Sequence, residues 1–125
     1  MRLKHVKGAN EIIVNGKYYV SDPYVYKGNW NKLFGNSNPI YIEIGMGKGN
    51  FIIENAKRYK DINFIGIEKY DSVIVRAIQK SNELDINNIK EISIPDRITY
   101  DSSGTASYHS VNAISFIYYC NRVNV

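Results

Sequence analysis

The chain has 125 residues, enough for one small domain with one hydrophobic core. Hydrophobic residues make up 44% of it and charged residues 22%, as in a soluble globular protein, and it has neither a signal-peptide pattern nor an apolar run long enough to span a bilayer. Its single cysteine, Cys120, excludes an internal disulfide, so we expect a reducing, cytoplasmic setting and no membrane.

The charge is unevenly distributed along the chain. Residues 1–60 hold ten Lys or Arg against four acids, whereas residues 61–125 hold six against eight. A basic amino-terminal half suits an anionic partner such as nucleic acid. The solvated surface of a slightly basic protein would have the same charges, so charge alone leaves both interpretations open.

Residues 1–38 show no clear periodicity and form a basic, aromatic segment. Four aromatic residues lie about one helical turn or less apart, interleaved with two lysines: Tyr24, Tyr26, Trp30 and Phe34, with Lys27 and Lys32. One interpretation is a surface that stacks on RNA bases. The other, which we favour, is a short helix over residues 29–34 that packs Trp30, Leu33 and Phe34 onto the core.

A glycine-rich turn between a strand and a helix is the most informative stretch. An apolar strand is predicted over Ile40–Ile44, and a helix opens at Phe51 with Asn50 as its N-cap. Three glycines form the turn between them: Gly45, Gly47 and Gly49. Glycine lets the backbone turn sharply and lets a ligand approach the main chain closely.

The same plan continues through two more strands. The second predicted strand, residues 63–67, ends on an acid, Glu68. Asp71 or Ser72 is expected to cap the next helix, and residues 89–94 form the third strand. Parallel strands need a right-handed crossover, which the two helices supply. The pattern therefore predicts an α/β fold of the β-α-β-α-β type.

Three regions are expected along the chain. Residues 1–38 form the amino-terminal basic and aromatic segment, residues 39–94 the β-α-β-α-β unit, and residues 95–125 a divergent tail. Residues 95–110 show no helical stripe, whereas residues 111–119 are typical of an apolar strand. That strand is a candidate to cover the far edge of the first strand, which would otherwise stay exposed.

Two common phosphate-binding motifs do not fit the glycine turn. A P-loop needs a Ser or Thr after its lysine, but Lys48 is followed by Gly49. The dinucleotide motif G-x-G-x-x-G fails because Asn50 stands where the third glycine belongs. In addition, Glu43 would lie near an anionic pyrophosphate and repel it.

S-adenosylmethionine fits better, because it has no phosphate and carries a sulfonium and an ammonium. Glu43, near the end of the first strand, suits those positive charges. Glu68, at the end of the second strand, can accept hydrogen bonds from ribose hydroxyls, as the acid does in dinucleotide folds. The expected cofactor-binding residues are Glu43, Gly45, Gly47, Gly49 and Glu68. The alternative is that both acids are incidental surface residues.

Other candidates for chemistry carry little signal. His5 and His109 are far apart in sequence and lack metal-ligand spacing, so no metal site is expected. Cys120 has no C-x-x-C partner and is expected to be an inert thiol. Asp71 is best explained as a helix cap.

Four stretches go beyond what a glycine-rich α/β unit requires. They are Pro23-Tyr-Val-Tyr-Lys-Gly-Asn-Trp, Leu33-Phe-Gly-Asn, Ile42-Glu-Ile-Gly-Met-Gly-Lys-Gly and Phe64-Ile-Gly-Ile-Glu-Lys-Tyr-Asp-Ser-Val. Together they resemble bacterial tRNA (guanine-N7)-methyltransferases, over roughly residues 1–94. The resemblance implies a class I methyltransferase fold, a Rossmann-like three-layer sandwich, here incomplete with about three to four parallel strands.

The resemblance also implies an enzyme that transfers a methyl group from S-adenosylmethionine to N7 of a guanine in the tRNA variable region. It implies tRNA as the partner. Carried over by position, Glu43 and Glu68 look like cofactor ligands, and the three glycines of the turn shape the pocket.

The chain departs from the family after the third strand. The family has an acid there that contacts the adenine side of the cofactor, where this chain has Pro95, with Asp96 one residue late. The family's Ser-Asp-Pro-Trp-Pro-Lys stretch, with the catalytic aspartate, is missing, so no catalytic residue is assigned. The pattern is that of an amino-terminal portion joined to an unrelated tail, as a frameshift or truncation would produce. A non-catalytic S-adenosylmethionine- or RNA-binding fragment is therefore the alternative function.

Overall fold

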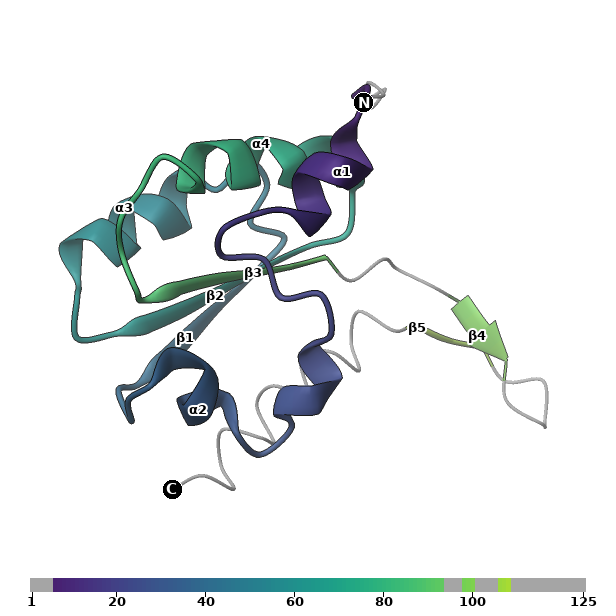
Figure 1. Ribbon diagram of the computed structural model, residues 1–125. Helices are drawn as coiled ribbons and strands as arrows, with labels where there is room; N and C mark the ends of the chain where they lie inside the picture. Colours follow the sequence, from purple (N-terminus) through teal and green to yellow (C-terminus); the bar gives the residue numbers. More distant parts are fainter. Residues whose placement is uncertain (1–5, 94–97, 101–105, 109–125) are drawn as a thin grey trace.

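The computed structural model describes residues 6–93, 98–100 and 106–108 (Figure 1). In the first range the elements are α1 (Ala9–Val14), the 3-10 helix η1 (Pro23–Tyr26), α2 (Trp30–Phe34), β1 (Ile40–Ile44), α3 (Asn50–Arg58), β2 (Asn63–Glu68), α4 (Asp71–Ser81) and β3 (Ile89–Ser93). None of the helices in these ranges is long and apolar enough to cross a membrane.

β1, β2 and β3 form a parallel sheet with β2 in the middle. The register pairs Ile44 with Ile67, and Glu68 with Ser93, so the three strands end along one edge of the sheet. Every residue of β2 is buried, as expected for the central strand of a parallel sheet. The predicted β-α-β-α-β plan is confirmed.

Helices cover both faces of this sheet. α1, α3 and α4 lie on one face, and η1 and α2 lie on the other (Figure 1). The apolar side chains divide in the same way. Phe64 and Ile74 belong to the cluster on the α3–α4 face, whereas Ile65 and Trp30 belong to the cluster on the α2 face. The predicted α/β class and the Rossmann-like sandwich are therefore confirmed for the described residues.

The segment before β1 packs on the sheet. α1 packs against α4, a helix that follows it by more than fifty residues. Tyr18 and Val20 run beside β3, where the N–H of Val20 donates to the carbonyl of Glu91 (2.9 Å) and the N–H of Glu91 donates to the carbonyl of Tyr18 (2.9 Å). No helix is predicted at α1 from the sequence, because its residues show no clear periodicity.

The position of α2 decides between the two interpretations of the aromatic segment. Trp30 and Phe34 are buried, and Leu33 packs partly buried against the same cluster. The ring of Tyr26 lies 5.7 Å from that of Trp30, between centroids. Core packing is therefore confirmed for α2, whereas Tyr24, in the preceding η1, is exposed.

Two predicted helix caps are wrong. Gly49, and not Asn50, is the N-cap of α3, because a glycine with a φ of 82° leads directly into the helix. Tyr70, and not Asp71 or Ser72, is the N-cap of α4. Asp71 lies instead in the first turn of α4, where a carboxylate interacts favourably with the helix dipole.

Two short strands follow β3 among the described residues. β4 (Ile98–Tyr100) and β5 (Ala106–Tyr108) pair with each other in antiparallel register. The sequence does not predict them, because three residues are too few to show an alternating pattern. The predicted strand at residues 111–119 lies outside the described residues.

Candidate functional site

The turn between β1 and α3 adopts a backbone that requires glycine. Gly45, Gly47 and Gly49 have φ angles of 73°, 61° and 82°, in the left-handed region. At Gly49 space is also limited, since an added Cβ would lie 2.9 Å from the Cβ of Ala77. At Gly45 and Gly47, no described atom would lie within 4 Å of an added Cβ. The first two glycines therefore face open space, as a ligand-binding turn needs.

Glu68 ties this turn to the loop that follows β2. Its Oε1 accepts a hydrogen bond from the N–H of Gly47 (3.2 Å), and its Oε2 accepts from the N–H groups of Lys69 (2.7 Å) and Tyr70 (3.0 Å). Glu68 is only 7% exposed. Because each carboxylate oxygen can accept two hydrogen bonds, Oε1 retains capacity for a further donor.

Glu43 lies on β1, beside Gly66 of β2 and on the face covered by α3 and α4. Its Oε2 is buried and has no hydrogen-bond partner among the described residues. Burial raises the pKa of this carboxyl above its ordinary value. A buried, unpartnered carboxylate oxygen is stabilised by a positively charged donor.

The register places the two predicted acids on one face of the sheet. Glu43 pairs with Gly66, and Glu68 follows Gly66 by two positions, so both side chains point to the α3–α4 face near the carboxyl ends of their strands. Gly66, between them, leaves room for the buried side chain of Met46, which an added Cβ would meet. The structure thus brings together Glu43, Glu68 and the glycine turn, the residues predicted from the sequence.

A second polar group lies at the carboxyl end of β3. The hydroxyl of Ser93 donates to Oδ1 of Asp71 at 3.5 Å, the long limit of a hydrogen bond. Burial, and then the negative charge of Asp71, raises the pKa of Tyr19. Sequence reasoning missed this group, because Tyr19 precedes Ser93 by more than seventy residues.

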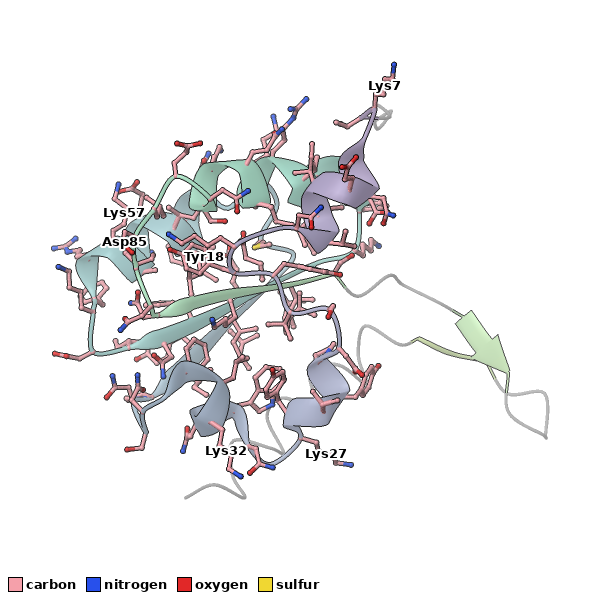
Figure 2. The ribbon with its side chains drawn as sticks, in the orientation of Figure 1. Lys7, Tyr18, Lys27, Lys32, Lys57 and Asp85 are labelled. Atoms are coloured by element: carbon pink, nitrogen blue, oxygen red, sulfur yellow. The ribbon has the colours of Figure 1, made fainter. Side chains whose placement is uncertain are left out.

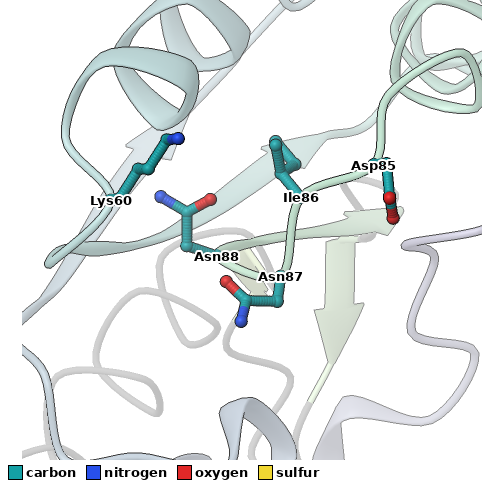
Figure 3. Close-up of a pocket in the computed structure, with 5 residues that line it drawn as sticks. All are labelled: Lys60, Asp85, Ile86, Asn87 and Asn88. Carbon is teal, nitrogen blue, oxygen red and sulfur yellow. The ribbon is translucent and has the colours of Figure 1, made fainter.

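Two pockets lie elsewhere in the described part of the molecule. One, of about 310 Å³, is lined by Lys60 and residues 85–88 before β3, at the amino-terminal edge of the sheet (Figure 3). The other, of about 180 Å³, lies between residues 17–26 and Lys90 of β3. Neither of these two pockets includes a residue of the glycine turn.

No group of three or more His, Cys, Asp or Glu in the described residues could hold a metal ion. Glu68 is a hydrogen-bond acceptor, and both acids of the candidate site can supply negative charge. Together with open space above Gly45 and Gly47, they suit a polar ligand that carries positive charge and hydroxyl groups.

Comparison with known proteins shows what the chain is similar to. Residues 37–97 match the family model described as "Putative methyltransferase". The chain is 52% identical over 89 residues to a tRNA (guanine-N(7)-)-methyltransferase of Lachnoclostridium phytofermentans, covering 71% of this chain and 42% of the relative. It is 47% identical over 95 residues to that of Bacillus subtilis, covering 75% and 45%.

A third relative aligns over a longer stretch. The tRNA (guanine-N(7)-)-methyltransferase of Brevibacillus brevis is 40% identical over 118 residues, covering 94% of this chain and 52% of the relative, so the alignment includes part of the tail after residue 94. The chain spans about half the length of these relatives. The predicted resemblance is confirmed: residues 37–97 match a methyltransferase family model, and most of the chain is similar to about half of a bacterial tRNA (guanine-N(7)-)-methyltransferase.

Proposed function

We propose that the chain binds S-adenosylmethionine at the carboxyl ends of β1 and β2. The observation that carries this proposal is the buried Oε2 of Glu43, which has no partner among the described residues. A buried carboxylate oxygen costs free energy unless a donor or a positive charge meets it. A ligand with an ammonium and a sulfonium, and without phosphate, meets that requirement.

Each residue of the site has a distinct proposed role. Glu43 offsets the positive charge of the ligand, and Glu68 accepts from its ribose hydroxyls through the remaining capacity of Oε1. Gly45 and Gly47 leave the space in which the ligand lies, and Gly49 packs the turn against α4. The hydrogen bonds that the N–H groups of Gly47 and Tyr70 donate to Glu68 hold both loops in place before the ligand arrives.

We further propose that the acceptor of the methyl group is N7 of a guanine in tRNA, as the names of the relatives suggest. When bound, S-adenosylmethionine supplies a methyl group on a positively charged sulfur. N7 of guanine carries a lone pair and no proton, so the protein needs no general base. Its task is to align the acceptor, and alignment supplies much of the rate in such reactions. A tRNA substrate suits a cytoplasmic protein.

A second candidate function rests on a specific observation. The 125-residue sequence lacks the Ser-Asp-Pro-Trp-Pro-Lys stretch that the resemblance leads one to expect. A chain that binds S-adenosylmethionine or RNA without transferring the methyl group would have the same described site.

One experiment separates the two functions. The chain is incubated with unmodified tRNA and S-adenosylmethionine labelled in its methyl group, and label in N7-methylguanine is measured beside the Glu68→Ala variant. Transfer above that variant supports the enzyme. Cofactor binding by calorimetry without transfer supports the binding fragment. Absence of both contradicts the proposed site.

A further inference from the structure

Two exposed aromatic residues and two lysines lie in or next to the two loops that carry the proposed cofactor site. We name this group the rim, and it consists of Lys48, Phe51, Lys69 and Tyr70. Lys48 belongs to the glycine turn and Phe51 to the first turn of α3. Lys69 and Tyr70 directly follow Glu68, between β2 and α4.

The two halves of the rim lie side by side because Glu68 joins them. Its carboxylate accepts from the N–H of Gly47, which precedes Lys48, and from the N–H groups of Lys69 and Tyr70. These hydrogen bonds hold the backbone at Lys69 and Tyr70, and at Gly47 beside Lys48. The backbone of the rim is therefore fixed at the carboxyl edge of the sheet, where the candidate site also lies.

The aromatic rings of the rim are exposed to an extent that core packing does not explain. Phe51 is 69% exposed although it lies in a helix whose apolar face, with Ile52 and Ile53, is buried. Tyr70 is 44% exposed, and the Nζ of Lys69 lies 4.8 Å from the centroid of its ring. An exposed ring beside a cation is a surface on which a flat, electron-rich group can stack.

The charges around the rim favour an anionic partner once the site is loaded. Lys48 and Lys69 carry positive charge, and a third cation, Lys80, donates to Oδ1 of Asn50 in the first turn of α3. Glu68 and Asp71 carry negative charge here, with Asp71 accepting from Ser93. A cationic ligand held by Glu43 and Glu68 would offset that negative charge.

We propose that the rim binds unpaired nucleotides of an RNA chain, with bases stacked on Phe51 and Tyr70 and phosphates near Lys48 and Lys69. Proteins bind single-stranded RNA through surfaces on which cations alternate with exposed aromatic rings. The inference rests on the proposed function, because it places the RNA at the mouth of the cofactor site.

The chain supplies a matched control at the other end of α3. Arg58 lies 5.4 Å from the centroid of the Tyr59 ring, and Tyr59 is 43% exposed. This pair has the chemistry and exposure of Lys69 and Tyr70, but it follows α3 toward the opposite edge of the sheet, near Lys57 (Figure 2). If RNA bound any basic and aromatic surface, both pairs would contribute to binding. The rim proposal requires that only Lys69 and Tyr70 contribute.

The test is RNA binding by the full chain, measured as fluorescence anisotropy of a labelled single-stranded RNA of about ten nucleotides. Phe51→Ala and Tyr70→Ala are each expected to weaken binding at least about fivefold, as expected for loss of one stacked base. Tyr70→Phe keeps the ring and is expected to retain binding, and Tyr59→Ala is expected to change it less than twofold. Lys48→Ala is expected to lower the slope of log affinity against log salt by about 0.7.

The same samples are titrated with S-adenosylmethionine, which separates this inference from the proposed function. Equal losses in Tyr70→Ala and Tyr59→Ala would overturn the rim proposal, as would an unmodified chain that binds no RNA. Loss of cofactor binding with unchanged RNA binding in Tyr70→Ala would also overturn it, because the ring would then belong to the cofactor pocket. Absence of cofactor binding by the unmodified chain would overturn the proposed function alone.

Discussion

The carboxylate of Glu68 accepts a hydrogen bond from the backbone N–H of Gly47 at 3.2 Å, across 21 positions of the chain. This contact joins the ends of two neighbouring strands and holds the glycine turn over the edge of the sheet. The same residue thus has a structural role and a proposed role in binding ribose. Substitutions at Glu68 must therefore be examined for stability as well as for binding.

Glu68→Ala is expected to lower the free energy of unfolding by about 2 kcal/mol, because three backbone N–H groups lose their acceptor. Urea denaturation measures this change. Glu54→Ala, on the exposed face of α3, provides the control, since its ion pair with Lys57 is at the surface and contributes little. A loss in Glu68→Ala no larger than in Glu54→Ala would show that Glu68 does not organise the turn.

Gly49→Ala is expected to destabilise the protein by about 2 kcal/mol or more. Its φ of 82° is strained for any residue with a Cβ, and that Cβ would lie 2.9 Å from Ala77 Cβ in α4. Gly28→Ala separates the two causes, because Gly28 has a φ of 74° but no described atom within 4 Å of an added Cβ. We expect about 1 kcal/mol for Gly28→Ala. Equal losses by thermal denaturation would contradict close packing of the turn against α4.

Asn88, which follows α3 by thirty residues, caps the carboxyl end of that helix with its side chain. Its buried Nδ2 donates to the carbonyl oxygens of Ala56, Tyr59 and Ile62, at 2.9, 3.1 and 3.0 Å. Asn88→Ala leaves these acceptors without their donor and is expected to cost about 2 kcal/mol of unfolding free energy. The neighbouring, exposed Asn87 offers the matched variant Asn87→Ala, expected to change stability by less than about 0.5 kcal/mol. Urea unfolding of both variants checks the difference.

Glu91 makes stability depend on pH near neutrality. It is fully buried on β3, its Oε1 accepts from the hydroxyl of Ser81, and burial raises its pKa to about 7, with the Ser81 hydrogen bond opposing the shift. Between an unfolded pKa of 4.5 and this value the folded state binds more protons, so stability falls as pH rises. The loss approaches about 3 kcal/mol across this window.

The variant Glu91→Gln is expected to remove most of that dependence, because an amide does not titrate. Unfolding free energies at pH 5 and pH 8 check the prediction, with exposed Glu83→Gln as the control. A remaining, smaller slope of the same sign is expected from Glu43, whose pKa burial also raises. A slope unchanged in Glu91→Gln would show that Glu91 is not the titrating group.

The sequence predicts the strands and the two crossover helices well, because apolar runs and helical stripes report burial directly. It predicts that Glu43 and Glu68 share an edge, because parallel strands end together. Their further contacts depend on tertiary placement. No local sequence pattern predicts the hydrogen bond from the N–H of Gly47 to Glu68, and none predicts that Glu91 in β3 is buried.

The short elements show the same limit. α1 and α2 are six and five residues long, and burial against α4 and the sheet holds them in place more than their own propensity does. The buried Trp30 was predictable as core because it recurs with other apolar residues at helical spacing. The exposed Phe51 was not predictable, because its exposure depends on which face α3 presents to the sheet.

The central claim is that Glu43 and Glu68 hold a positively charged, ribose-containing ligand at the carboxyl ends of β1 and β2. Titration calorimetry of S-adenosylmethionine into the unmodified chain and into Glu43→Ala tests it most directly. The Oε2 of Glu43 has no hydrogen-bond partner among the described residues, so its removal breaks no such contact in the site. We predict binding that weakens by at least about 1.5 kcal/mol in Glu43→Ala, as expected for loss of a charge-assisted hydrogen bond. Equal affinity in the two proteins, or no binding to either, would contradict the account.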